Sequence, residues 1–464
     1  MCGLRRVSNR STMEKTFSTI TIGCKLNQFE TEWIREALIR RDWKFRRFED
    51  GAAFCIINSC TVTARSDARC RNAARRAKRT NPGSFVIVTG CYAETQRESL
   101  DGMREVDLVL GNGEKSSIPA ILDAIAERDR GNLPPDGPAI SMRKPPERFE
   151  IDRFLDHVRA FVKIQEGCNA SCSYCIVPRA RGPSRSVPVA DVLEQVSILW
   201  ENGYHEVVLS GVHIGRYGAD FDPPCSLADL VEAILERTSA VRVRLSSIEM
   251  NEVTPRLIDL MRATDRLAPH LHIPLQSGDD RILEAMNRSY RVSGFRGRIE
   301  EIARARDGIA IGTDIIVGFP GETEACFENT YELVRDLPIS HLHIFGYSPR
   351  PQTPAAAMAG TVGGERKRER GSRLIELGKA KRRAFLESHI GSVQLVLVQK
   401  PPRPQSSLVR SLTGTYCEVL LPKEIGARGS LVPVRVSRFD RGSLYGTSIE
   451  ENPALKPVTG ACAP

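Results

Sequence analysis

The chain has 464 residues, of which 41% are hydrophobic and 27% charged, as in an ordinary globular protein of roughly two to four domains. No apolar run approaches the roughly 18 residues of a membrane span, and residues 1–10 lack a hydrophobic signal core, so we predict a cytoplasmic protein without a membrane segment. The net charge of +9 favours a polyanionic partner, and thirteen cysteines without a secretion signal favour metal ligation over disulfides.

Residues 13–130 alternate short apolar strands with helical stretches, which predicts a parallel α/β domain. We expect strands at 16–22, 53–58, 85–89 and 106–110, and helices at 30–41, 66–78 and 116–126. Cys24, Cys60 and Cys91 each follow the end of one of these strands. The carboxyl ends of parallel strands meet at one edge of a sheet, so the three thiols can together hold an iron–sulfur cluster.

The middle helix of this domain, read over 65–79, is strongly basic. Cys70, Ala73, Ala74 and Ala77 recur at helical spacing and form its apolar face. The remainder carries seven cations against one acid, Asp67: Arg65, Arg69, Arg71, Arg75, Arg76, Lys78 and Arg79. Runs of this kind are usually solvated surface, yet like charges repel one another unless an anion compensates them. Two interpretations stand side by side, a plain surface helix and a phosphate-binding face. The residues assigned to the second are Arg69, Arg75, Arg76 and Arg79.

Residues 131–148 are rich in Pro and Gly and predict a linker, after which a second domain spans 149–387. Its expected strands are 160–165, 206–212, 241–248, 270–275, 309–317 and 340–347. Helical patterns intervene at 189–200, 227–236, 254–261, 281–287, 294–306 and 324–335. Six βα units predict a partial (βα)6 barrel, with ligands at the carboxyl ends of its strands and a lateral opening for a macromolecule.

Three cysteines follow the first strand of this domain at the spacing C-x3-C-x2-C: Cys168, Cys172 and Cys175. A 4Fe–4S cluster normally takes four cysteines, so three leave one iron free to bind something else. Zinc is the alternative, but it needs a fourth ligand, and the nearest following histidine is His205.

This motif resembles that of the radical S-adenosylmethionine (SAM) enzymes, in which SAM chelates the free iron. Together with the three N-terminal cysteine blocks, it resembles the radical SAM methylthiotransferase family over nearly the whole chain. The resemblance implies two 4Fe–4S clusters. Cys168, Cys172 and Cys175 would hold the SAM cluster, and Cys24, Cys60 and Cys91 an auxiliary cluster that carries or delivers sulfur.

Small and polar residues collect at the strand ends of the second domain. By resemblance, Ser210 and Gly211 would meet the methionine amino group of SAM. Ser246, Gln276 and the strand from Gly312 to Gly318 would line its ribose and adenine. The plainer interpretation is a set of ordinary βα turns, in which small residues are common.

Two histidine pairs, His270 with His272 and His341 with His343, alternate along predicted strands and therefore share a face in each. A metal site is conceivable there. Because no acidic or cysteine partner stands at a recognisable spacing, we favour histidines that line the core.

A charged helix after Pro354 leads into a third domain at 388–451, with strands predicted at 393–399, 415–421, 431–439 and 444–449. This segment resembles the TRAM domain, a small RNA-binding β-barrel. Its few aromatic residues, Tyr416, Phe439 and Tyr445, favour recognition of RNA backbone and shape over base stacking. Residues 452–464 are expected to be a loose tail.

The resemblance implies methylthiolation of carbon 2 of an adenine beside the tRNA anticodon, with electrons from a flavodoxin- or ferredoxin-type donor and sulfur from a source that no residue identifies. The block from Gly23 to Glu32 most resembles the branch that acts on N6-threonylcarbamoyladenosine at position 37. Three alternatives stay open: the isopentenyladenosine branch, the branch that modifies a ribosomal-protein aspartate, and a non-catalytic iron–sulfur RNA sensor.

Overall fold

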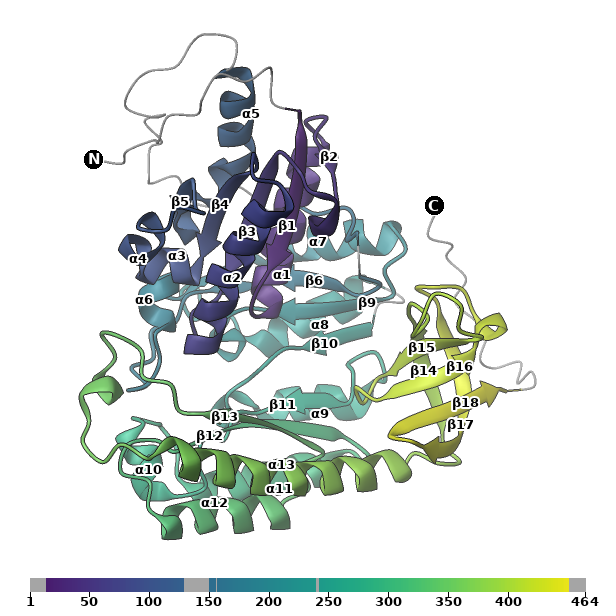
Figure 1. Ribbon diagram of the computed structural model, residues 1–464. Helices are drawn as coiled ribbons and strands as arrows, with labels where there is room; N and C mark the ends of the chain where they lie inside the picture. The colour runs from purple at the N-terminus through teal and green to yellow at the C-terminus, as the bar shows by residue number, and fades with distance from the viewer. Residues whose placement is uncertain (1–13, 129–149, 156, 239–241, 450–464) are drawn as a thin grey trace.

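The computed structural model describes residues 14–128, 150–155, 157–238 and 242–449 (Figure 1). The linker predicted at 131–148 and the tail predicted at 452–464 lie outside these residues. Figure 1 shows an N-terminal sheet with helices, a central arc of strands flanked by helices, and a small C-terminal barrel. Within the described residues, no helix combines the length and the apolar character needed to cross a bilayer.

The N-terminal domain is a parallel sheet of five strands in the order β2-β1-β3-β4-β5, as predicted for an α/β domain. Its strands are β1 (Thr16–Thr21), β2 (Lys44–Phe45), β3 (Phe54–Ser59), β4 (Phe85–Gly90) and β5 (Leu108–Leu110). Its helices are α1 (Lys25–Ile39), α2 (Ala64–Thr80), α3 (Cys91–Thr95), α4 (Arg97–Asp101) and α5 (Ile118–Arg128), with short 3₁₀ turns at η1 (Phe48–Asp50) and η2 (Asn112–Ser117). Helix α1 begins at Lys25 rather than at the predicted residue 30. The prediction missed its first turns because Asn27 and Glu30 are buried there through hydrogen bonds with Arg181, and buried polar residues give no apolar periodicity.

The central domain is an open arc of two parallel three-stranded sheets, β10-β9-β6 and β11-β12-β13, which single bridges link. Its strands are β6 (Ala160–Lys163), β9 (Glu206–Ser210), β10 (Arg242–Leu245), β11 (His270–His272), β12 (Ala310–Val317) and β13 (His341–Gly346), and β7 (Gln165–Glu166) pairs with β8 (Arg185–Ser186). Its helices are α6 (Val177–Arg181), α7 (Val189–Glu201), α8 (Leu227–Arg237), α9 (Pro255–Ala263), α10 (Asp280–Ala285), α11 (Val292–Ala305) and α12 (Glu324–Asp336), with turns η3 (Ile214–Arg216), η4 (Met250–Glu252) and η5 (Pro354–Ala357). Strands β6 and β13 form the two edges, so the predicted partial barrel is confirmed.

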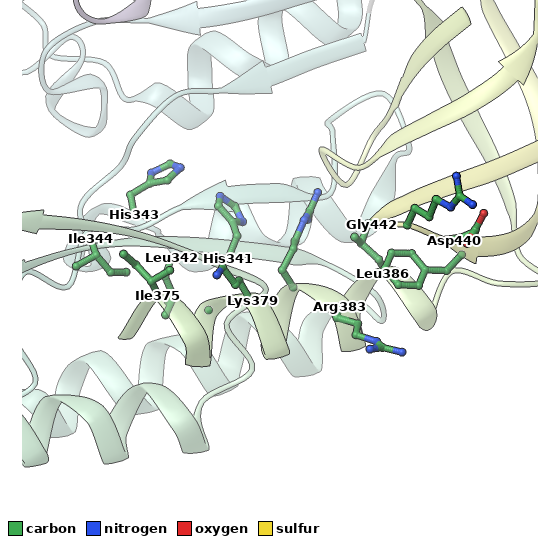
Figure 2. Close-up of a pocket in the computed structure, with 14 residues that line it drawn as sticks. His341, Leu342, His343, Ile344, Ile375, Lys379, Arg383, Leu386, Asp440 and Gly442 are labelled. Carbon is green, nitrogen blue, oxygen red and sulfur yellow. The ribbon is translucent and has the colours of Figure 1, made fainter. Parts of the chain in front are cut away.

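Helix α13 (Gly364–Glu387) runs along the outer side of β13 and leads to the C-terminal barrel (Figures 1 and 2). A Cβ atom on Gly378 would lie 3.3 Å from Leu342 Cβ, so the missing side chain lets the helix approach the strand closely. Because side chains alternate along a strand, Leu342 faces this helix while His341 and His343 point to the opposite side (Figure 2).

The C-terminal domain is a closed five-stranded barrel in the order β14-β15-β16-β18-β17. Its strands are β14 (Val393–Val398), β15 (Leu408–Thr413), β16 (Glu418–Pro422), β17 (Leu431–Asp440) and β18 (Ser443–Ser448), and η6 (Lys423–Ile425) is a short turn. The predicted barrel is confirmed, but β15 was not predicted. Ser411 and Thr413 are buried in it through hydrogen bonds rather than apolar contacts, so its sequence lacks the usual alternation. The strand predicted at 415–421 begins only at Glu418, because Tyr416 adopts a left-handed turn conformation with φ of 62°.

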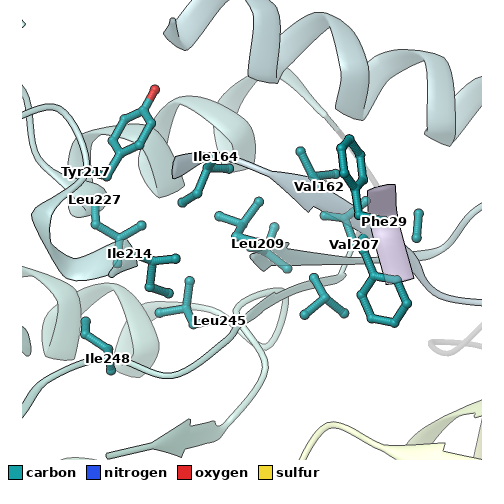
Figure 3. Close-up of a cluster of buried hydrophobic side chains, with 14 of the residues drawn as sticks. Phe29, Val162, Ile164, Val207, Leu209, Ile214, Tyr217, Leu227, Leu245 and Ile248 are labelled. Atoms are coloured by element: carbon teal, nitrogen blue, oxygen red, sulfur yellow. The ribbon is translucent and has the colours of Figure 1, made fainter. Parts of the chain in front are cut away.

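The three domains are firmly joined. Phe29 of α1 belongs to the same buried hydrophobic cluster as Val162 of β6 and Val207 of β9 (Figure 3). On the other side, Arg242 and Arg244 of β10 donate hydrogen bonds to carbonyl groups of the C-terminal barrel.

Candidate active site

The C-x3-C-x2-C segment forms a loop between β7 and α6, at the carboxyl end of β6. The amide of Cys168 donates to the carbonyl of Gly182 at 3.1 Å, and the amide of Cys175 donates to that of Cys172 at 3.0 Å. Burial, with smaller contributions from the nearby Cys172 and Cys168, raises the pKa of the Cys175 thiol to about 12. The structure therefore gathers the three predicted ligands.

Positively charged groups surround this triad. The Nδ1 atom of His213 lies 3.4 Å from Cys168 Sγ, and its Nε2 atom lies 2.8 Å from Glu252. Although burial raises the pKa of Cys168, the hydrogen bond with His213 contributes to a net lowering. Arg288 donates to Cys172 Sγ at 3.3 Å. Such neighbours stabilise thiolate ligands and the negative charge of a cluster.

The second triad lies at the carboxyl edge of the N-terminal sheet, where Cys24, Cys60 and Cys91 follow the adjacent strands β1, β3 and β4. Gly23 has a φ of +124°, and a Cβ atom there would lie only 2.7 Å from Cys60 Cβ. Only glycine lets the first and second cysteines come this close. Burial raises the pKa of Cys60 to about 11, with further contributions from the neighbouring Cys91 and Cys24.

Both triads fit an iron–sulfur cluster better than a single ion. Among the described residues, the compact group of ligand atoms, all within 4.8 Å of one another, is His272, Asp314 and His343, and neither cysteine triad forms such a group. Zinc with sulfur ligands at about 2.3 Å requires a closely packed set. Three widely spaced sulfurs suit the corners of a cube with one open iron.

A cavity of about 180 Å³ is lined by residues of the N-terminal and central domains. Val62 and Thr63, just after Cys60, line one side, and Cys175 lines the other. The remaining lining residues are Tyr174, Ile176, Val177, Gln276, Asp314, Ile316, Phe345, Gly346, Tyr347 and Ser348. Cys175 lines this chamber directly, and Val62 and Thr63 bring the segment after Cys60 to it, at the carboxyl ends of β11, β12 and β13.

The short helix α6 connects the triads on the other side. It begins two residues after Cys175 and ends at Arg181, which donates to Asn27 Oδ1 at 2.6 Å and to Glu30 at 2.7 Å. Asn27 in turn accepts from Cys24 Sγ at 3.7 Å. The domain interface thus holds the two triads in a fixed relation.

Four of the six residues predicted to contact SAM lie at strand ends of the central domain, and one of them lines this chamber. Ser210 ends β9 and Gly211 follows it, Ser246 follows β10, and Gln276 lines the cavity. The hydroxyl of Ser246 is buried and has no hydrogen-bond partner among the described residues, as expected where a ligand supplies one.

The other two predicted residues, Gly312 and Gly318, are packed against side chains of the protein. A Cβ atom on Gly312 would lie 2.2 Å from the His341 ring, and one on Gly318 would lie 2.4 Å from the side chain of Lys367. The lack of a side chain at both positions makes room for protein atoms, and a SAM contact there stays a prediction.

The histidine pairs have an acidic partner that sequence reasoning missed. Asp314 Oδ1 lies 3.0 Å from His272 Nε2 and 3.1 Å from His343 Nδ1, and Ser247 contacts His272 Nδ1 at 2.8 Å. Asp314 lies 42 and 29 residues from its two partners, so no local spacing reveals the contact. The four side chains form a chain of hydrogen bonds across the inner face of the arc.

The predicted RNA-contacting arginines lie on the exposed side of α2. Arg76 stacks on Phe48 with 4.2 Å between its guanidinium carbon and the ring centroid, and Arg75 donates to Asn72 at 3.2 Å. Within the described residues, Arg69 and Arg79 form no ion pair. Arg76 also lies 3.8 Å from Glu49, so Arg69, Arg75 and Arg79 are the members of this set without an ion pair in the part of the chain that the structure describes.

Two family models match the chain: the radical SAM superfamily over 162–334 and the uncharacterized protein family UPF0004 over 16–111. The chain is 38% identical to the threonylcarbamoyladenosine tRNA methylthiotransferase MtaB of Aquifex aeolicus, over 82% of this chain and 91% of that protein. The chain belongs to the radical SAM methylthiotransferase family. Membership implies a 4Fe–4S cluster and SAM, and it agrees with the donor sets described above.

This methylthiotransferase is also similar to the tRNA-2-methylthio-N(6)-dimethylallyladenosine synthase of Methylacidiphilum infernorum, with 31% identity over 92% of this chain and 94% of that protein. Among solved structures, the radical SAM methyltransferase TsrM from Kitasatospora setae superposes with a TM-score of 0.51 at 14% identity, covering 74% of this chain and 75% of that one. At that identity the likeness shows the fold alone.

Proposed function

We propose that this methylthiotransferase acts on N6-threonylcarbamoyladenosine at position 37 of tRNA and produces its 2-methylthio derivative, using two 4Fe–4S clusters. The observation that carries the proposal is the chamber of about 180 Å³ that is lined by Cys175 of one triad and by Val62 and Thr63, which follow Cys60 of the other. A reaction that joins sulfur to a carbon activated at another centre needs both centres beside one substrate atom.

When bound, the SAM cluster supplies a 5′-deoxyadenosyl radical that takes hydrogen from carbon 2, while the auxiliary cluster supplies sulfur and a second SAM supplies the methyl group. Cys168, Cys172 and Cys175 would hold the first cluster, and Cys24, Cys60 and Cys91 the second. The protein orients these groups and keeps water out.

His213 and Arg288 place positive charge beside the SAM cluster ligands, and Arg181 does so beside the auxiliary ligands. Ser210, Gly211, Ser246 and Gln276 would position SAM at the strand ends. These assignments rest on placement in the fold.

The substrate branch rests on similarity. Identity to the relative named for threonylcarbamoyladenosine is 38%, and to the relative named for dimethylallyladenosine 31%. The isopentenyladenosine branch is therefore the second candidate. A ribosomal-protein substrate is a third, which an RNA assay without product would favour.

The proposal includes tRNA as partner, with Arg69, Arg75, Arg76 and Arg79 of α2 as one phosphate-contacting surface. It also includes a flavodoxin- or ferredoxin-type electron donor and a division into domains at 13–130, 149–387 and 388–451. Because tRNA is a cytoplasmic molecule, we place the reaction in the cytoplasm.

The test is mass spectrometry of tRNA nucleosides from cells lacking the protein and from the same cells complemented. Loss and return of 2-methylthio-N6-threonylcarbamoyladenosine supports the proposal. A change in the isopentenyl derivative instead moves the enzyme to that branch, and no change in any nucleoside contradicts a tRNA substrate.

Two cysteine variants test the roles of the triads in purified enzyme. We expect Cys168→Ala to abolish SAM cleavage, and Cys24→Ala to retain cleavage but form no methylthio product. Full methylthiolation by the Cys24 variant would refute the auxiliary-cluster assignment.

A further inference from the structure

A cluster of cations fills the inner side of the arc, behind the histidines, and centres on Tyr416 of the C-terminal barrel. The ring centroid of Tyr416 lies 5.9 Å from Lys25 Nζ and 5.3 and 5.1 Å from the guanidinium carbons of Arg159 and Arg244. Lys25 belongs to the N-terminal domain, while Arg159 and Arg244 belong to the central one. Together with Arg242 and Arg382, we call these residues the interior cation cluster: Lys25, Arg159, Arg242, Arg244 and Arg382.

Three of these cations share one carboxylate. Glu206 lies 2.5 Å from Arg242, 2.9 Å from Arg244 and 3.8 Å from Arg159. Glu206 and Arg244 are both fully buried. One negative charge cannot neutralise three positive ones, so these contacts alone leave positive charge in excess within the protein.

The other two cations add to the excess. Lys25 and Arg382 form no ion pair within the part of the chain that the structure describes. The nearby carboxylate of Asp314 is already engaged by His272 and His343. Lys25 and Arg382 are half-buried, and holding unpaired charge partly away from water is costly, so a bound counter-ion lowers that cost. The interior cation cluster therefore favours the binding of an anionic ligand.

The histidines beside the cluster supply uncharged hydrogen-bond donors. His270 is 3% exposed, and neither of its ring nitrogens has a hydrogen-bond partner among the described residues. Its ring stacks on His341 with centroids 5.7 Å apart and lies 4.9 Å from that of Tyr416. Burial lowers the pKa of His341 to about 3, with help from His343 and His272, so its ring is neutral at physiological pH. A neutral imidazole still carries one N–H that can donate to an anion.

A groove of about 800 Å³ lies along β13, where α13 and the C-terminal barrel meet it. His341 and His343 of β13 line its inner wall, and α13 and the β17–β18 turn form the rest (Figure 2). Arg382 links the groove to the cluster, because it lines the groove and donates to the carbonyl of Tyr416 at 3.0 Å. The other cations that line it are Lys379, Arg383 and Arg441, and Asp440 is its one acidic lining residue, paired with Arg438 at 3.1 Å.

We propose that this groove and the interior cation cluster form an anion-binding subsite that receives the carboxylate of the N6-threonylcarbamoyl group. The inference rests on the proposed function. Its location supports it, because His343 of the groove is hydrogen-bonded to Asp314, which lines the chamber beside Cys175. A base held in that chamber has its substituent within reach of the groove. An isopentenyl group carries no charge and gains nothing from such a subsite.

A backbone phosphate of the anticodon loop offers the same anionic oxygens, and binding measurements separate the two sources. The probes are anticodon stem-loop RNAs with N6-threonylcarbamoyladenosine or plain adenosine at position 37, bound to the reconstituted two-cluster enzyme. The variant is Arg382→Gln, and the matched control is Arg366→Gln, an exposed arginine at the other end of the same helix.

If Arg382 contacts the carboxylate, the variant loses roughly 10- to 100-fold in affinity for the modified RNA and little for the unmodified one. If it contacts a phosphate, both RNAs lose equally and the salt dependence of binding falls by about one charge, which supports an anion subsite but overturns its assignment to the carboxylate. Unchanged affinity for both RNAs refutes the subsite. Arg366→Gln should leave both affinities unchanged.

Lys379→Gln guards against a folding artefact, because Lys379 is exposed at the mouth of the groove and its removal disturbs no buried contact. Lys379→Gln should lower the preference for the modified RNA over the unmodified RNA by a smaller factor than Arg382→Gln does. An unchanged preference would contradict the subsite. Product formation by the unmutated enzyme tests the proposed function separately. The unmutated enzyme could methylthiolate the modified RNA while the Arg382→Gln variant still prefers the modified RNA to the unmodified one as strongly. That result would support the proposed function and refute the subsite.

Discussion

Replacing Arg244 with methionine should release the C-terminal barrel from the central domain. The Arg244 side chain is fully buried and donates to Glu206 at 2.9 and 3.2 Å. It also donates to the carbonyls of Gly414 at 2.8 Å and Thr413 at 3.1 Å, in the turn between β15 and β16. Methionine fills a similar volume but makes none of these four hydrogen bonds, so the substitution isolates the polar contribution.

The loss of docking free energy can be worked out from the groups that lose their Arg244 partner, the Glu206 carboxylate and the two carbonyls. Breaking a buried ion pair by removing one partner costs about 3–5 kcal/mol, and each buried carbonyl without a donor costs about 1–3 kcal/mol. Because Glu206 keeps Arg242 at 2.5 Å and the Thr413 carbonyl keeps the amide of Tyr416 at 3.2 Å, both contributions are reduced, and together they come to about 3 kcal/mol. Opening of the docked turn should therefore become about 100-fold more frequent.

Amide hydrogen exchange in this turn measures the opening directly. The amides of Thr413 and Tyr416 donate to the carbonyls of Cys417 and Thr413, so their protection reports on the docked conformation. Arg237→Met, an exposed arginine on α8, is the control and should leave their exchange unchanged. Equal protection in the Arg244 variant and the unmutated protein would refute the view that these hydrogen bonds hold the barrel in place.

Three further expectations concern the clusters and the docking contact. Gly23→Ala should displace the Cys60 thiol and lower the iron content from about eight to about four atoms per chain, and an unchanged iron content would contradict the auxiliary site. Although burial raises the pKa of Glu206, Arg242 and other cations lower it to about 2. Its contribution to docking is fully present above about pH 4.5 and is lost as the pH falls toward 2, a decline that amide exchange should detect and that Glu206→Gln should remove. Arg288→Met removes a hydrogen bond to cluster sulfur and should lower the reduction potential of the SAM cluster, measured by redox titration with electron paramagnetic resonance, and an identical potential would count against that contact.

Much of the fold could be predicted because its signals are local. Apolar runs at strand spacing located six strands of the arc, and the basic pattern at 65–79 located α2 to within one residue at each end. Strand β15 escaped prediction because its buried residues include Ser411 and Thr413, which hydrogen bonds satisfy inside the barrel. The first turns of α1 escaped for a related reason, since Asn27 and Glu30 are buried against Arg181 of another domain.

The sequence by itself determined the parts of the site that lie within one segment or at strand ends. The spacing of Cys168, Cys172 and Cys175 implies a cluster with an open iron, because one short loop carries all three ligands. The tertiary structure alone decided that the segment after Cys60 lines the same chamber as Cys175, and that Asp314 lies between His272 and His343. It also decided that cations from the N-terminal and central domains collect around Tyr416 of the C-terminal barrel. Contacts of this kind join residues far apart in the chain, so they depend on how domains pack and leave no periodic or spaced pattern in the sequence.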